Sequence, residues 1–213
     1  MDAIELIDKA TEYVQAVELR VDLLEKHDLD FVKQQVSLLR RQTALPIIFT
    51  VRSKGQGGGF VGSVQHMFDL LQLAARIGCE FIDMEVAWDS VHKNRLLKNK
   101  GISKVIGSHH DFSADLAITE NSLTKLFNKC LCSELIDVLK VVVMAQRVDD
   151  CYTMQRVLKH FEEQRTKTVE MKNVIGLIGL CAGDSGKLSR VMNKFMTPVT
   201  HPVLPFKAAP GQL

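Results

Sequence analysis

Membrane-spanning segments and blocks of one charge are missing from this 213-residue sequence. Its longest apolar run, residues 174–182, is far shorter than the roughly 18 residues that a membrane-spanning helix needs. Its 27 basic and 25 acidic residues leave a net charge of +2 and are mixed along the chain. Both absences argue against a membrane or a nucleic acid as a partner.

Cysteine is scarce and follows no known pairing pattern. The five cysteines make an odd count, and only Cys130 and Cys132 lie close together in the sequence. Their spacing is neither that of a zinc knuckle nor that of a CxxC redox pair. We therefore expect reduced thiols in a cytoplasmic protein. We expect no metal site, because no other cluster of histidine and cysteine offers matching ligands.

A glycine-rich phosphate-binding loop is also absent. Residues 55–59 follow a predicted strand but lack the lysine and the hydroxyl residue of such a loop, and the spacing in residues 179–187 is wrong for one. Residues 183–186, GDSG, are similar to a serine-protease fragment, but no disulfide framework or paired histidine segment accompanies them. We interpret all three stretches as loop glycines and expect no cofactor.

What the chain does contain is an alternation of short apolar segments with amphipathic ones. The apolar segments predict seven strands, over residues 16–23, 46–52, 81–86, 104–108, 138–144 and 174–180 and near 199–204. The amphipathic segments predict helices over residues 2–13, 29–41, 63–77, 90–99, 120–131, 149–164 and 187–195. Such an alternation is typical of an α/β fold with a parallel sheet, and no linker interrupts it. We expect residues 1–213 to form one domain.

Two architectures fit these units: a doubly wound sheet and most of a (βα)8 barrel of the TIM type. Charged or titratable side chains recur on or directly after successive predicted strands, namely Glu18, Arg20, Asp22, Arg52, Asp83, Glu85, His110 and Lys140. In a barrel, such positions converge on one mouth. A nucleotide-binding sheet would instead concentrate its signal in a single glycine-rich turn. The pattern therefore favours the barrel.

Lys140 interrupts the otherwise apolar segment 137–146, which is typical of a strand buried on both faces. An ammonium group in that place is costly unless it is paired or loses its proton. A buried neutral amine can attack a carbonyl carbon. The alternative is a lysine at a strand end that reaches solvent.

His110 belongs to the stretch 109–112, HHDF, at the end of a predicted strand, where a general acid–base would be placed. The alternative is a surface histidine pair in a turn. A lysine amine and a histidine, with arginines in the chain and no cofactor motif, fit Schiff-base chemistry on an anionic ketone. The imine withdraws electrons, so a histidine can remove a proton from the neighbouring carbon.

Seven segments together carry a family resemblance. They are ELRVD at 18–22, FTVRS at 49–53, IDME at 82–85, SHHDF at 108–112, KVVVM at 140–144, SR at 189–190 and APGQ at 209–212. In this order they resemble the type I 3-dehydroquinate dehydratases, the (βα)8 Schiff-base lyases of the shikimate pathway. The segment RSKGQGGGF at 52–60 is most similar to the dehydratase domain of the fungal pentafunctional arom polypeptide.

The resemblance implies a role for each matching residue in making 3-dehydroshikimate from 3-dehydroquinate by syn elimination. Lys140 would form the imine, and His110 would take the α proton and later protonate the departing hydroxyl. Arg190 would bind the substrate carboxylate. The remaining substrate-binding residues would be Glu18, Arg20, Arg52 and Gln212. The resemblance also implies aromatic amino acid biosynthesis in the cytoplasm, as a homodimer or as part of a larger multidomain polypeptide.

The sequence departs from the family pattern at three positions and at both ends. Ala208 replaces a serine that often closes over substrate, and His201 stands about where a phenylalanine usually lies. Gln56 stands where many relatives have a glutamate close to the catalytic histidine, so a carboxylate that supports His110 would come from elsewhere, such as Asp83 or Glu85. The family's first barrel strand and last helix have no counterpart, which predicts a barrel truncated at both ends.

Two other functions remain open: a non-catalytic regulatory or remnant domain related to the quinate repressors, and another Schiff-base barrel enzyme such as an aldolase. The intact Lys140, His110 and Arg190 disfavour the first, and the HHDF and APGQ segments disfavour the second.

Overall fold

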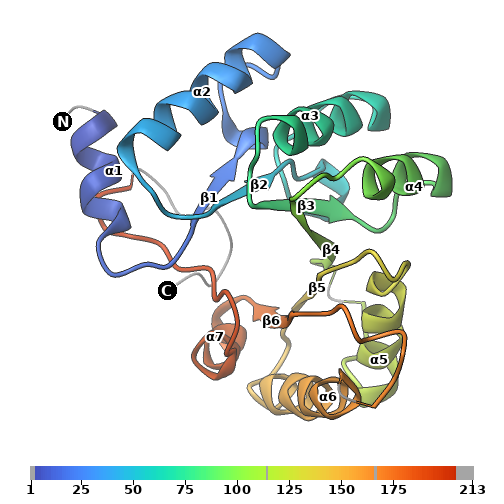
Figure 1. Cartoon of the computed structure of the whole chain (residues 1–213). Coiled ribbons are helices and arrows are strands. Elements are labelled where there is room, and N and C mark those ends of the chain that lie inside the picture. The colour runs from blue at the N-terminus through green and yellow to red at the C-terminus, as the bar shows by residue number, and fades with distance from the viewer. Residues whose placement is uncertain (1–2, 114, 166, 205–213) are drawn as a thin grey trace. The chain divides into compact units, whose positions relative to one another are not determined.

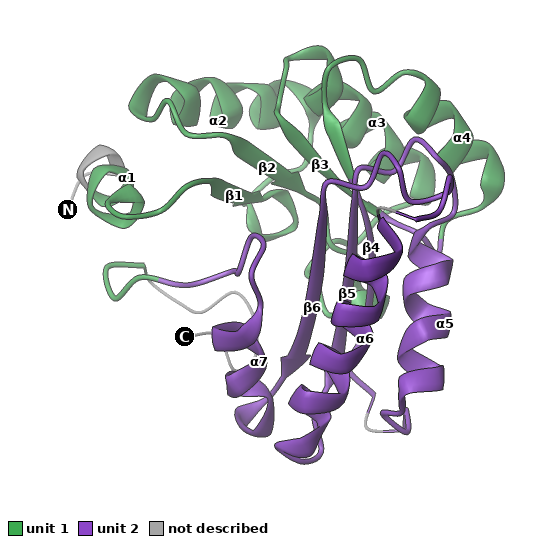
Figure 2. Ribbon diagram, turned by 60° about the horizontal axis from the view of Figure 1, so that its bottom comes forward, with its two compact units in different colours: residues 1–84, 88–105, 201–205 green, residues 85–87, 106–200, 206–213 purple. Residues whose placement is uncertain are grey.

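The computed structural model describes residues 3–113, 115–165 and 167–204 (Figure 1). The chain divides into two compact units (Figure 2). Of the described residues, unit 1 comprises 3–84, 88–105 and 201–204, and unit 2 comprises 85–87, 106–113, 115–165 and 167–200. In the described part of the chain, no helix is both long and apolar enough to cross a membrane.

Unit 1 alternates helices with short parallel strands. Its elements are α1 (Ala3–Thr11), β1 (Val17–Arg20), α2 (Leu29–Gln42), β2 (Ile47–Thr50), α3 (Val64–Arg76), most of β3 (Phe81–Glu85) and α4 (Ser90–Lys98). Strand β2 pairs in parallel with both β1 and β3. Capping side chains fix where the helices begin: Asp28 accepts from the Phe31 amide at α2, and Asp89 accepts from the amides of Val91 and His92 at α4.

Unit 2 repeats this pattern. It contains most of β4 (Lys104–Asp111), followed by α5 (Glu120–Cys130), β5 (Val138–Met144), α6 (Asp149–Arg165), β6 (Gly176–Ala182) and α7 (Lys187–Met192). Strand β5 pairs in parallel with β4 and β6. All residues of β5 except Met144 are buried, and so is every residue of β6, as expected for strands covered on both faces.

The two faces of the unit 2 strands can be told apart by their glycines. A Cβ atom on Gly179 would lie 2.8 Å from the Met154 sulfur of α6, and one on Gly107 would lie 2.8 Å from the Cys130 carbonyl of α5. Residues 107 and 179 therefore point to the side on which α5 and α6 pack. Their immediate neighbours along each strand point to the opposite side.

The predicted α/β class and the parallel strands are confirmed, and the boundaries of β5 match the prediction. The prediction of a strand near residues 199–204 is wrong. This stretch is irregular and ends in a turn, in which the Leu204 amide donates to the His201 carbonyl. Pro198 and Pro202 explain the error, since proline lacks the amide that a strand needs. The described residues thus form six strands rather than seven.

Two further boundaries correct the predicted positions of polar residues. Strand β1 ends at Arg20, so Asp22 lies in the 3₁₀ helix Val21–Leu23 and not on the strand. Strand β4 continues to Asp111, so His110 lies within the strand rather than after it. An in-strand position fixes the direction of the His110 side chain more firmly than a loop would.

Candidate active site

Lys140 and His110 lie on the same face of the β4–β5 pair in unit 2. Ser108 is the register partner of Lys140, and His110 is the partner of Val142. Side chains two positions apart on a strand point to the same side, so Ser108, His110 and Lys140 share one face. This is the face opposite α5 and α6. Only 7% of Lys140 and 9% of His110 is exposed.

Lys140 has apolar neighbours toward β6 and further along its own strand. Ile178 of β6 is its other register partner, and Val142 follows on the same face of β5. The Cys130 thiol of α5 donates to the Lys140 carbonyl at 3.5 Å, which ties this part of β5 to the helix. The alternative of a lysine at a strand end that reaches solvent is therefore wrong, because Lys140 is in mid-strand and buried.

His109 points to the other side of β4. Its register partner is Val141, on the face that carries Gly107 and Gly179. Burial lowers the pKa of His109, and the nearby positive charge of Lys129 on α5 adds to the effect. Its Nδ1 is buried and has no hydrogen-bond partner among the described residues. His109 is thus a helix-facing residue, whereas the His110 ring lies 6.1 Å from that of Phe112, between ring centroids.

Arg190 is held by the short helix α7, just beyond the carboxyl end of β6. The Ser189 hydroxyl accepts from the Cys181 amide at 2.8 Å and donates to the Gly186 carbonyl at 2.7 Å, which fixes α7 against the strand end. Arg190 is 3% exposed, and its guanidinium donates to the Pro198 carbonyl at 3.2 Å. Burial lowers the pKa of Arg190, although a guanidinium stays charged at neutral pH.

Unit 1 carries the other predicted binding residues on one face of its strands. Arg20, Thr50 and Asp83 are register partners across β1, β2 and β3. Glu18 lies on the same face of β1 as Arg20 and accepts a hydrogen bond from the Thr50 hydroxyl at 2.8 Å. Arg52 follows β2 and forms an ion pair with Asp83 at 2.7 Å, in which both side chains are almost fully buried. The opposite face is apolar, with Phe49 and Ile82 at 0% exposure.

Two carboxylates that were not predicted to bind substrate hold Arg20 and Arg52. Asp83 pairs with Arg52, and Asp22 forms a two-pronged hydrogen bond with Arg20, at 2.8 Å to Nε and 2.6 Å to the terminal nitrogen. Burial alone would raise the pKa of Asp22, but the hydrogen bond and charge of Arg20 outweigh burial and lower it. The alternation of charge on the strands already marked Asp83 in the sequence, but it did not predict the pairing of Asp83 with Arg52. Nothing in the sequence predicts the pairing of Asp22 with Arg20.

The glycine-rich loop 55–59 and the residue after it form hydrogen bonds with Asp22 and Arg52. The Gly59 amide donates to Asp22 at 2.9 Å, and the Phe60 amide donates to the Arg52 carbonyl at 3.1 Å. Gly57 has a positive φ of 78°, which glycine adopts without strain. Gln56, at the position where relatives have a glutamate, is 6% exposed. The loop is thus held in place by Arg52 and by Asp22, the partner of Arg20.

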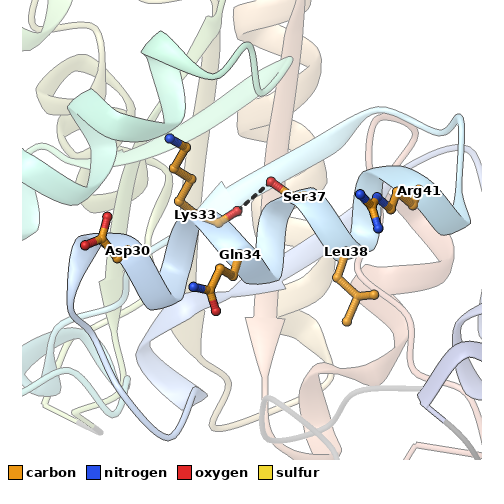
Figure 3. A pocket seen from close by; sticks show the side chains of 6 residues that line it. All are labelled: Asp30, Lys33, Gln34, Ser37, Leu38 and Arg41. Carbon is orange, nitrogen blue, oxygen red and sulfur yellow. Dashed lines mark hydrogen bonds between the residues drawn. The ribbon is translucent and has the colours of Figure 1, made fainter.

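Gln212, the last predicted binding residue, lies outside the described residues. A shallow hollow on the outer side of α2 is lined by side chains of that helix alone, among them Asp30, Lys33 and Arg41 (Figure 3). Among the described residues no three His, Cys, Asp or Glu side chains are grouped as a metal site would need. None of the five cysteines, all of which lie in the described part of the chain, forms a disulfide.

The fold and the polar residues define a class: a parallel α/β protein with a buried lysine and histidine on one strand face. A sequence model of the type I 3-dehydroquinase family matches residues 1–213, and the chain therefore belongs to that family. The predicted family is thus confirmed.

Similarity to solved structures extends the comparison. The dehydroquinate dehydratase and shikimate dehydrogenase from S. pombe AroM is 39% identical, with a TM-score of 0.89 over 99% of this chain and 40% of that chain. The chain thus spans about two fifths of the length of the fungal protein. The 3-dehydroquinate dehydratases of Clostridium difficile and Geobacillus kaustophilus are 23% and 21% identical. Their TM-scores are 0.78 and 0.76, over 98% and 99% of this chain and 80% and 79% of theirs. The two bacterial structures support the fold alone, and the higher identity to the fungal protein agrees with the sequence-based expectation.

Proposed function

We propose that the chain dehydrates 3-dehydroquinate to 3-dehydroshikimate in the shikimate pathway, with Lys140 forming a Schiff base and His110 acting as general acid–base. The observation that carries this proposal is the shared face of Lys140 and His110, opposite the packed helices of unit 2. Membership in the type I 3-dehydroquinase family supports 3-dehydroquinate as the substrate.

The proposed reaction uses only groups of this chain and the substrate. The Lys140 amine attacks the ketone carbon to give a carbinolamine. Its hydroxyl takes up a proton and leaves as water, so that the protonated carbon–nitrogen double bond, the iminium, forms. The resulting iminium draws electrons from the adjacent carbon, so His110 can remove a proton from it. The electrons return to form the carbon–carbon double bond as the neighbouring hydroxyl leaves with the proton from His110. Water then hydrolyses the imine and regenerates the Lys140 amine.

The arginines and Glu18 would bind the substrate. Arg190, with its planar donor fork, suits the substrate carboxylate. Glu18, Arg20 and Arg52 would contact hydroxyl groups. The ion pairs of Arg20 with Asp22 and of Arg52 with Asp83 support this role, because they hold the two side chains in one orientation before substrate arrives. Gln212 is proposed as a further contact on the basis of the family resemblance alone.

The larger context is proposed in the same way. The parallel strands and the family support one domain with the (βα)8 barrel architecture. Similarity to the fungal protein supports a multidomain polypeptide. A homodimer and a cytoplasmic location rest on the resemblance.

The decisive experiment combines turnover with trapping. Incubation with 3-dehydroquinate should produce the enone absorbance of 3-dehydroshikimate, and borohydride added during turnover should fix ligand mass on Lys140, as peptide mapping would show. A label on another lysine, or no label on a folded and active protein, would contradict the mechanism. A folded protein that binds 3-dehydroquinate but never turns it over would instead support the non-catalytic regulatory domain.

A further inference from the structure

Glu85 is a buried acid in unit 2 to which the proposed mechanism gives no role. It is the last residue of β3 and is 3% exposed. The Val86 amide donates to the Ser108 carbonyl at 3.0 Å. In a parallel ladder this hydrogen bond aligns Glu85 with Ser108.

Glu85 therefore belongs to the same row of side chains as Lys140, since Ser108 is the register partner of Lys140. Residues in register on adjacent strands point to the same face, which here is the face opposite α5 and α6. Glu85 and Lys140 are two strand spacings apart, or roughly 10 Å between backbones. Ser108, the residue between them, has a small side chain that leaves room for a long carboxylate and a long amine to approach each other.

The charges that face Lys140 in unit 2 make an acid in this row important. His110 is on the same face of β4, and the buried cation Arg190 lies on α7, the helix that follows β6. The partner of Lys140 on β6 is the apolar Ile178. A buried cation in such surroundings needs a negative charge, because desolvation without pairing costs several kcal/mol.

We propose that Glu85 is a positioning residue that supplies the counter-charge for Lys140, first as the ammonium and then as the iminium. The inference rests on the proposed function. Condensation converts the ammonium and the ketone into the iminium and one water, so the positive charge on nitrogen is the same before and after the step. One carboxylate in this row can therefore compensate for both species. Keeping the imine protonated preserves its ability to withdraw electrons while His110 moves the proton.

The test uses Glu85→Gln, which keeps the shape and removes the charge. Asp137→Asn is the matched control, because Asp137 is also buried but lies just before β5, three residues from Lys140. With saturating 3-dehydroshikimate as the ligand, borohydride should trap at least about tenfold less adduct on Glu85→Gln than on the wild type. Its kcat should fall far more than its KM changes. Glu85→Asp should recover part of both losses, and Asp137→Asn should retain the wild-type values within about twofold.

The outcomes separate this inference from the function on which it depends. If wild-type protein is neither trapped nor active, the proposed function fails. If wild-type protein is trapped and Glu85→Gln is trapped equally well with unchanged kcat, the counter-charge role is overturned and the function stands. If Glu85→Gln does not melt cooperatively, Glu85→Asp decides the question: a shortened carboxylate should lower kcat and the trapped fraction, and unchanged values would contradict the proposal.

Discussion

His110 lies on β4 two residues after Ser108, the register partner of Lys140, and on the same face of the sheet as Lys140. Ser108 pairs with Lys140, and His110 with the next residue on that face of β5, Val142. The His110 imidazole and the Lys140 amine are therefore diagonal neighbours on this face of the β4–β5 pair. A substrate carbon bonded to the Lys140 nitrogen would present its neighbouring carbon toward His110, which is the arrangement that imine-assisted proton removal needs.

The two adjacent histidines should differ sharply in function. His110→Ala should reduce kcat by roughly 10²–10⁴-fold, the range ascribed to general acid–base catalysis. His109→Ala should cost much less, because its ring points toward α5, where burial already lowers its pKa. Steady-state turnover of both variants, after their cooperative melting is confirmed, makes the comparison. Equal losses would show that the assigned histidine is wrong.

Arg190 should matter through its geometry as well as its charge. Arg190→Lys keeps the positive charge but loses the planar fork, so KM for 3-dehydroquinate should rise by roughly 10–100-fold, the equivalent of one strong charged hydrogen bond. The control is Arg156→Lys, at an exposed arginine of α6 that pairs with Glu120. It should leave KM unchanged. An equal KM in both variants would exclude Arg190 from substrate binding.

Lys140→Ala should abolish turnover and borohydride trapping together. Non-covalent binding of 3-dehydroquinate should persist, because Arg190 and its support by Ser189 do not depend on the lysine. Isothermal titration with the folded variant measures that binding. Residual adduct formation on the variant would show that another lysine forms the imine.

Lys140 and His110, the proposed catalytic pair, could be selected from the sequence because each lies in a segment with a strong local pattern. The continuous apolar run around Lys140 specifies a doubly buried strand, and its boundaries, Val138–Met144, are those observed. Pairing partners have no such local signal. Arg52 and Asp83 are 31 positions apart, and Asp22 reaches Gly59 only because the chain turns into a 3₁₀ helix after Arg20. The predicted strand near residues 199–204 does not form, despite the apolar pattern of this stretch, because its prolines cannot donate the backbone hydrogen bonds that a strand needs.

Asp22 should make stability depend on pH in the acid range. Its pKa lies below the ordinary 3.8, despite burial, because of Arg20. The unfolded chain therefore binds the proton first. The stabilisation is complete above about pH 4 and is lost as the pH falls through the lowered pKa of the folded state.

Asp22→Asn should reveal this contribution. It should lower the free energy of unfolding at pH 7 by about 3–5 kcal/mol, the cost of leaving one partner of a buried ion pair. The decline of stability below about pH 4 should be shallower than in the wild type. Urea unfolding from pH 3 to pH 7 measures both effects. Asp8→Asn, at an exposed acid of α1, should stay within about 0.5 kcal/mol of the wild type at pH 7. A parallel pH profile for wild type and Asp22→Asn would contradict the assignment.

Gly58 should be intolerant of any side chain, because a Cβ atom there would meet the Arg52 carbonyl oxygen at 2.1 Å and the Arg52 Cβ at 2.5 Å. The obstacle is largely backbone, which cannot rotate away as a long side chain can. Gly58→Ala should therefore destabilise the protein by about 1–3 kcal/mol. It should also raise KM, since displacement of Arg52 disturbs its ion pair with Asp83. Gly55→Ala, three residues earlier, has no atom within 4 Å of the added carbon and should be neutral or slightly stabilising. Thermal unfolding and steady-state kinetics on the two variants test the difference. If Gly58→Ala melts like the wild type with unchanged KM, the loop does not constrain Arg52 and the binding role proposed for that arginine loses its structural support.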